Sequence, residues 1–207
     1  MAILGAVGAV YMQTDAAAVA FTDEATTGDA GHLRYQIDDT TMRYWDRATT
    51  ITVDADAVLV DADDYTIEYL SGYIVFAVAR GGAEVITVCG AYVTLAQLGG
   101  VFGWSLEISS AAAECTTLSS NSWRENIAGV VGFQGSVEAY WLNGDVLGLL
   151  TSDTELVFLL YTDAGVSLQR YEGFGHLTTD GVKLAVDAVT QEPLEFQGTD
   201  VLYYREA

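Results

Sequence analysis

Residues 123–141 read WRENIAGVVGFQGSVEAYW, and this stretch is the most informative about the fold. Gly129, Gly132 and Gly135 recur every three residues, which suits a phosphate-binding loop, a bulged strand or a close approach of two backbones. A nucleotide loop needs a paired GxG and a following helix, whereas the residues after Gly135 alternate as a strand does. The stretch is therefore predicted to be a strand, with Gly132 and Gly135 at bulge or close-approach positions.

The predicted strand has two chemically different faces, because side chains alternate along a strand. One face is apolar, and the other is small, polar and acidic. A second alternating segment, residues 104–109 (WSLEIS), divides in the same way. An ordinary solvent-facing side of a β-sandwich would give this pattern as well. The polar positions of the two segments are Ser105, Glu107, Ser109, Gln134, Ser136 and Glu138.

The rest of the chain consists of short alternating segments separated by turn residues. Residues 65–70 (YTIEYL) and 73–78 (YIVFAV) flank Ser71-Gly72 and predict a β-hairpin. Residues 155–162 are almost continuously apolar, as in a strand buried on both faces. Residues 182–191 and 194–198 are predicted to be further strands, and residues 145–150 (DVLGLL) a short helix capped by Asp145. This series predicts a mainly β protein, a β-sandwich or barrel with one short helix.

Composition narrows the classes of function. The 207 residues are 51% hydrophobic, which is enough for a core, and they carry 29 acidic against 8 basic side chains, a net charge of −21. Such a surface repels phosphates, so binding of DNA or RNA by charge neutralisation is not expected. DNA could still pass close to the protein without being held. A salt-rich habitat would produce the same acidity.

Known catalytic and ligand-binding motifs are missing from the sequence. It has no GxSxG, no GxxxxGK[ST] and only two histidines, so we expect neither an enzyme nor a cofactor or metal site. Cys89 and Cys115 are expected to be buried free thiols. The acidic segment 54–64 fails as an EF-hand at Leu59 and Tyr65, which favours a solvated loop. A basic leader and an apolar run of about 18 residues are also missing, so neither a signal peptide nor a membrane span is expected.

Three phrases in the second half occur in a familiar order. They are R-E-x-I-x-G at 124–129, F-x-G-S-x-E-x-Y-W at 133–141 and Q-E-P-L-E-F-Q-G-T at 191–199. Their order and spacing resemble the major tail (tail tube) proteins of long-tailed bacteriophages and related archaeal viruses, over roughly residues 86–204. Residues 86–207 are therefore expected to form a β-sandwich or barrel of tail-tube type. Residues 1–85 resemble the family less and are expected to be an N-terminal β-rich arm or added module.

The resemblance implies a structural virion protein that forms hexameric rings, stacked into a tube through which the genome passes without specific binding. Its partners would be further copies of itself and other tail proteins, in the virion tail after assembly in the host cytoplasm. The inner wall of such tubes is usually acidic, so the six polar positions above become candidates for the lumen face. The segment 111–122 becomes the candidate ring-stacking loop, through Ala111, Glu114, Thr116, Ser119 and Asn121.

Two other classes of function stay open at this point. The first is an acidic β-sandwich that binds glycans or calcium through the segment 54–64 and exposed aromatic side chains such as Trp45. The second is a hydrolase that uses a pair of carboxylates, a signal with little specificity in a chain with 29 acids.

Overall fold

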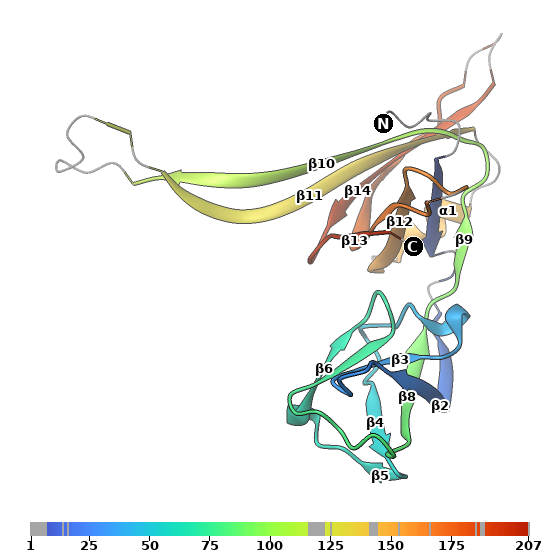
Figure 1. Cartoon of the computed structure of the whole chain (residues 1–207). Coiled ribbons are helices and arrows are strands. Elements are labelled where there is room, and N and C mark those ends of the chain that lie inside the picture. Colours follow the sequence, from blue (N-terminus) through green and yellow to red (C-terminus); the bar gives the residue numbers. More distant parts are fainter. Residues whose placement is uncertain are drawn as a thin grey trace. The chain divides into compact units, whose positions relative to one another are not determined.

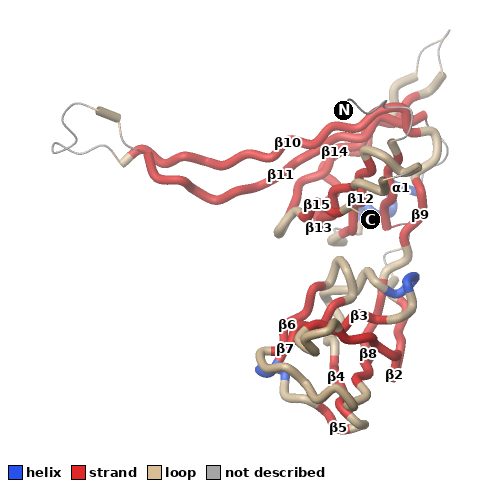
Figure 2. The backbone as a smooth tube through the Cα atoms, viewed as in Figure 1, coloured by secondary structure: helices blue, strands red, loops and turns tan. Residues whose placement is uncertain are grey.

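The computed structural model describes residues 8–13, 15, 17–115, 123–124, 126–140, 145–152, 154–165, 167–184, 186 and 189–206. The chain divides into two compact units, one formed by residues 13–96 and the other by residues 1–12 and 97–207 (Figures 1 and 2). This division differs from the boundary expected at residues 85 and 86. The strand β8 (Ile86–Tyr92) pairs with two strands of the first unit, and β1 (Ala9–Gln13) pairs with a strand of the second.

The first unit is a seven-stranded antiparallel sheet in the order β5-β4-β8-β2-β3-β7-β6. The hairpin expected around Ser71-Gly72 is confirmed, because Tyr65 pairs with Phe76 and Glu68 with Tyr73. Gly72 has a φ of 62°, which glycine adopts without strain. Besides β8, the elements are β2 (Val19–Gly28), β3 (Arg34–Ile37), β4 (Thr52–Ala55), β5 (Val58–Leu59), β6 (Tyr65–Glu68), β7 (Tyr73–Phe76) and 3₁₀ turns at Thr40–Met42 and Ala62–Asp64.

The second unit is a sheet in the order β10-β11-β14-β13-β12-β1-β9, with β15 also pairing β13. The prediction of a mainly β fold with one short helix is confirmed for the part of the chain that the structure describes. The strand expected over residues 182–191 is not seen among the described residues before Gln191, where Lys183 makes only an isolated bridge to Gln191. The elements are β9 (Leu95–Gln97), β10 (Val101–Glu114), β11 (Asn126–Tyr140), α1 (Asp145–Thr151), β12 (Leu156–Tyr161), β13 (Arg170–Asp180), β14 (Gln191–Gly198) and β15 (Tyr203–Arg205).

The main core cluster of the second unit lies on one face of this sheet, and β12 is buried on both of its faces. Residues 156–160 of β12 are all buried, as their continuous apolar run predicts. Phe158 stacks on Phe196 of β14 with ring centroids 4.5 Å apart. Val146 and Leu149 of α1 belong to the same cluster. The two buried residues lie three positions apart and therefore share one side of the helix. The helix α1 is thus amphipathic.

A buried carboxylate ties the C-terminal strand to this unit. Glu172 of β13 is fully buried and accepts from Arg170 Nε at 2.5 Å and from Arg205 Nε at 2.6 Å. Arg205 belongs to β15, which pairs with β13 beside the ion pairs. Removing one partner of a buried ion pair typically costs about 3–5 kcal/mol, so the last strand is an integral part of the fold.

The three glycines of the opening stretch prove to have different roles. A Cβ on Gly135 would overlap the Phe196 ring and lie 2.6 Å from the Ser105 carbonyl oxygen, which confirms a close approach there. A Cβ on Gly132 would meet nothing within 4 Å, and Gly132 pairs with Ser109 outside the register shift, so the expected bulge or close approach at that residue is wrong. The crowded partner is instead Gly129, whose Cβ would overlap the Ala111 carbonyl where the β10–β11 register shifts.

This difference gives a matched pair of variants. We expect Gly135→Ala to lower the free energy of unfolding by about 1–3 kcal/mol, because the added methyl overpacks the space between β10 and Phe196. Gly132→Ala, three residues away on the same strand, should change it by less than about 0.5 kcal/mol. Urea unfolding measures both values. Equal effects of the two substitutions would contradict the close-approach role of Gly135.

One acidic side chain is buried without a basic partner near it among the described residues. Glu192 lies on the core side of β14, only 5% exposed, close to Asp180 at the end of β13. Burial raises the pKa of Glu192 above its ordinary 4.5, and the Asp180 carboxylate adds to the effect. Because the folded state holds this proton more tightly, the stability that it contributes is complete below pH 4.5 and is lost as the pH rises through the raised pKa.

Glu192→Gln should therefore stabilise the protein at neutral pH, because the amide stays uncharged where the buried wild-type carboxyl has to ionise beside Asp180. The gain should shrink as the pH falls from neutral through the raised pKa of Glu192, where the wild-type carboxyl regains its proton. Thermal unfolding across this range measures it. Glu195→Gln, on the exposed face of the same strand, is the control and should show no such trend. A gain independent of pH would rule out the protonation of Glu192 as its cause.

Candidate functional site

The polar positions predicted from the sequence form one continuous face of the second unit. Pairing between β10 and β11 places Ser105 opposite Ser136 and Glu107 opposite Gln134. Pairing between β11 and β14 extends these rows, because Ser136 lies opposite Glu195 and Gln134 opposite Gln197. We call this surface the polar wall; its residues are Ser105, Glu107, Ser109, Gln134, Ser136, Glu138, Glu195 and Gln197.

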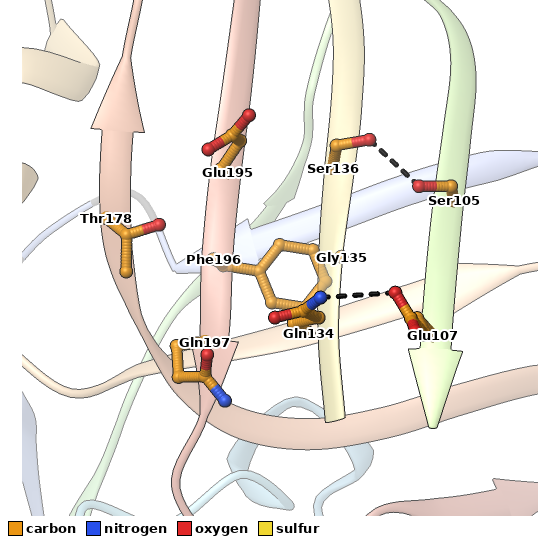
Figure 3. A pocket seen from close by; sticks show the side chains of 9 residues that line it. All are labelled: Ser105, Glu107, Gln134, Gly135, Ser136, Thr178, Glu195, Phe196 and Gln197. Carbon is orange, nitrogen blue, oxygen red and sulfur yellow. Dashed lines mark hydrogen bonds between the residues drawn. The ribbon is translucent and has the colours of Figure 1, made fainter. Parts of the chain in front are cut away.

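Hydrogen bonds between neighbouring strands hold the polar wall together. Ser105 Oγ and Ser136 Oγ are 2.9 Å apart, and Gln134 Nε2 donates to Glu107 Oε2 at 3.1 Å (Figure 3). Both contacts follow the strand register, in which these residues face each other directly. The side chains are thus positioned by the backbone pairing of rigid strands.

The other two predicted positions lie on the same face, farther along the strands. Ser109 lies opposite Gly132, and Glu138 lies between Gly103 on β10 and Pro193 on β14. Both side chains are exposed. The structure therefore brings all six predicted residues to one surface.

The strand β14 also contributes to the polar wall, at positions that were not among the predicted six. Glu195 and Gln197 alternate with the buried Leu194 and Phe196, and Thr179 Oγ1 donates to Glu195 Oε2 at 3.1 Å. The alternation in the quoted segment QEPLEFQGT would have revealed two polar positions. Only the register between β11 and β14 shows that they continue the same rows.

A shallow depression of about 280 Å³ lies within the polar wall, with Gly135 and Phe196 among its lining (Figure 3). Glu107 and Glu195 contribute carboxylates to its rim. The strands β10, β11 and β14 contain no lysine or arginine, so these charges have no basic partner within the three strands. A phosphate approaching the wall meets net repulsion, which salt screens beyond about 8–10 Å.

The candidate stacking segment is only partly a loop. Ala112 pairs with Ala128 and Glu114 with Asn126, so β10 continues through residues that composition assigned to a loop. Strand pairing depends on backbone groups, and a run of small residues does not prevent it. Glu114 also forms an exposed ion pair with Arg124 at 3.0 Å. Thr116, Ser119 and Asn121 lie outside the described residues.

The hairpin formed by β10 and β11 extends well beyond its neighbouring strand (Figure 1). Only residues 134–140 of β11 pair with β14, whereas residues 126–133 pair with β10 alone or lie at bulges. We call residues 109–132 the arm. Its described side chains are largely exposed and include Ile127, Val130 and Val131. A two-stranded ribbon without a packed face is marginal alone, which suits a segment completed by another chain.

Two observations weaken the alternative in which the protein is a glycan- or calcium-binding module. Trp45 is not an exposed aromatic residue, because it is fully buried against Phe21 in the core of the first unit. In the acidic segment, Asp61 Oδ1 accepts from the amide of Asp63 at 3.1 Å, as a cap does. Its carboxylates therefore serve the local backbone at least in part.

One group of potential metal ligands occurs among the described residues. Oxygen atoms of Asp23 and Asp54 and the sulfur of Cys89 lie within 4.8 Å of one another in the first unit. Exposed carboxylates often gather in this way without a metal, so the expectation of no metal site stays a prediction. Cys89 and Cys115 are free thiols, as expected, but both are only half-buried.

Comparisons with known proteins add a limited similarity. No protein-family model and no curated protein matches the sequence. One similar solved structure is the tail of an empty GTA particle with C6 symmetry, at a TM-score of 0.46 and 16% identity over 54% of this chain and 87% of that one. Another is the virion of a native gene transfer agent (GTA) particle, at 0.46 and 14% over 54% and 88%. Both are too distant to assign a function.

The sequence predicts no membrane span, and the helices of the structure bear on this prediction. No helix within the described ranges is long and apolar enough to cross a bilayer.

Reversing the charge of the polar wall should create an affinity for DNA. We expect the triple variant Glu107→Lys, Glu138→Lys, Glu195→Lys to bind duplex DNA below about 0.1 M salt and to release it as salt rises, because each lysine can displace a counterion from phosphate. Fluorescence anisotropy with labelled DNA measures this binding. The wild-type protein should not bind.

A control variant separates local from overall charge. Asp38→Lys, Asp63→Lys, Asp64→Lys has the same net charge at three exposed positions of the first unit. It should bind DNA far more weakly than the wall variant. Equal affinities would mean that overall charge, and not the polar wall, determines how the protein meets DNA.

Proposed function

We propose that this protein is a structural tail-tube subunit, whose copies form rings that stack into a conduit for a viral genome. The single observation that carries the proposal is the polar wall: three neighbouring strands with carboxylates, small polar groups and no basic side chain, opposite a packed core. The resemblance of the sequence to tail tube proteins supports the same function.

The ends of the sheet support ring formation. Within the described residues, β10 and β9 terminate the main strand order of the second unit, and each leaves one side of its backbone unpaired in the monomer. Unpaired strand edges favour addition of another strand. If β10 of one copy meets β9 of the next, the sheets join head to tail and the series closes into a ring. Six copies per ring is the number that the family resemblance implies.

The acidity of the polar wall has a physical role in this proposal. A passage lined with lysine or arginine would hold the genome through counterion release, whereas a carboxylate lining keeps the phosphates solvated and free to slide. The protein would carry out no catalysis and need no cofactor. It would be located in the tail of the virion after assembly in the host cytoplasm, in contact with further copies and other tail proteins.

The arm is the candidate contact between successive rings. It extends beyond β14, its apolar side chains are exposed, and it contains the described part of the predicted stacking segment. An arm of this kind can add to a neighbour by strand pairing or by docking of its side chains.

Electron microscopy of the purified full-length chain tests the proposal. We expect hollow tubes or six-fold rings at salt from about 0.1 M to about 2 M, since the net charge of −21 is screened over that range. A variant in which an Asn-Gly turn replaces residues 111–130 closes the hairpin at the Ser110–Val131 pair. It should form rings that do not stack.

Monodisperse monomers under all these conditions would reject the tail-tube proposal. A rise in melting temperature with calcium or a sugar would then favour the alternative, an acidic β-sandwich that binds one of them. Normal tubes from the variant with the shortened arm would reject only the stacking role of the arm.

A further inference from the structure

Two exposed apolar surfaces lie at opposite ends of β14. The first is a groove of about 600 Å³ where the arm leaves the sheet. Its lining comes from β10, β11 and the segment after β14, and includes Ile108, Val130, Val131, Asp200, Val201 and Leu202. Exposed apolar patches with few polar groups commonly mark contact sites between proteins.

The second surface is the connection between β13 and β14. Its described residues include Val182, Leu184, Val186 and Val189, all strongly exposed, and Leu184 is 81% accessible. Lys183, the only lysine of the chain, lies between Val182 and Leu184 and is exposed as well. We call these five residues the apolar connection.

One copy cannot bring these two surfaces together. Gln191, bridged to Lys183, begins β14, and Gly198, which lines the groove, ends it. Seven residue steps at about 3.3 Å each separate them by about 23 Å along a strand fixed in the middle of the sheet. Figure 1 shows the arm and the β13–β14 connection leaving the second unit on different sides. A contact between the surfaces therefore requires two copies.

We propose that the apolar connection of one copy inserts into the groove of the next copy, so that copies associate head to tail. The inference rests on the proposed self-assembly and deepens it by naming the contact. This insertion would remove apolar side chains of both surfaces from water, which favours association. The charges also match, because the single lysine sits among the inserting side chains and Asp200 lies in the lining of the groove.

The approach of Lys183 to Asp200 is unusual for a chain as acidic as this one. With a net charge of −21, most arrangements of two copies bring carboxylates together. The insertion of the apolar connection is an arrangement that brings a cation to an acidic residue. A single insertion of this size is a weak contact, but a contact repeated around a closed assembly gains from effective concentration.

Complementation between two variants tests the contact. Leu184→Glu disrupts the apolar connection and leaves the groove intact. Val201→Glu disrupts the groove and leaves the apolar connection intact. Each variant alone should associate at least about 10-fold more weakly than the wild type in sedimentation velocity. Mixed in equal amounts, they should form a heterodimer, because one intact groove still meets one intact connection. Leu147→Glu, at an exposed apolar position of α1, is the control and should assemble as the wild type does.

A charge exchange tests the orientation of the contact. Lys183→Asp and Asp200→Lys should each weaken association up to about 5-fold, and the doubly exchanged chain should recover part of the loss. Circular dichroism and urea unfolding confirm that each variant is folded.

The outcomes separate this contact from the proposed function. If the two single-site variants assemble like the wild type, or if their mixture yields no heterodimer, the contact is rejected while tube formation stands. A wild type that stays monomeric at high concentration rejects both. Wild-type tubes together with a heterodimer from the mixture establish the contact.

Discussion

The antiparallel pairing of β11 with β10 on one side and β14 on the other is the interaction on which the rest of the second unit depends. It fixes at once which side chains enter the core and which form the polar wall, because the two sets alternate along the same strands. A slip of one residue would move Phe133 and Val137 into water and carry Gln134 and Glu138 into the core. Gly135 protects this register, since its missing side chain leaves room for the Phe196 ring and the Ser105 carbonyl.

The proposed function places two opposing requirements on the distribution of charge. Copies that assemble must approach one another despite a net charge of −21, and a wall that passes a polyanion must not hold it. In the second unit, the carboxylates of the polar wall lie on one face of the sheet. The apolar connection, which includes Lys183, and the groove, which includes Asp200, lie at the two ends of β14. The carboxylates that repel other copies and the apolar surfaces proposed to attract them thus lie at different positions along β14.

The resemblance and the structure contribute different things to the proposed function. The family phrases sit in β11 and β14, and in the structure these segments are neighbours in one sheet. The two phrases also pack against each other in this chain: Gly135 accommodates Phe196, and Ser136 lies opposite Glu195. The first unit has its own sheet and its own core around Trp45, so its seven strands need nothing from the second unit to bury their apolar side.

The sequence by itself determined what depends on near neighbours along the chain. The alternation of residues 133–140 revealed the two faces of β11, the apolar run revealed β12, and the apolar spacing of residues 145–150 revealed α1, since these signals have periods of a few residues. Only the tertiary structure decided which distant segments meet. It added Glu195 and Gln197 to the polar wall, carried β10 as far as Glu114 in the presumed stacking loop, buried Trp45, and placed a close approach at Gly129 and not at Gly132. Pairing register between segments some 60 residues apart has no local signature, because it results from how all the strands pack into one core.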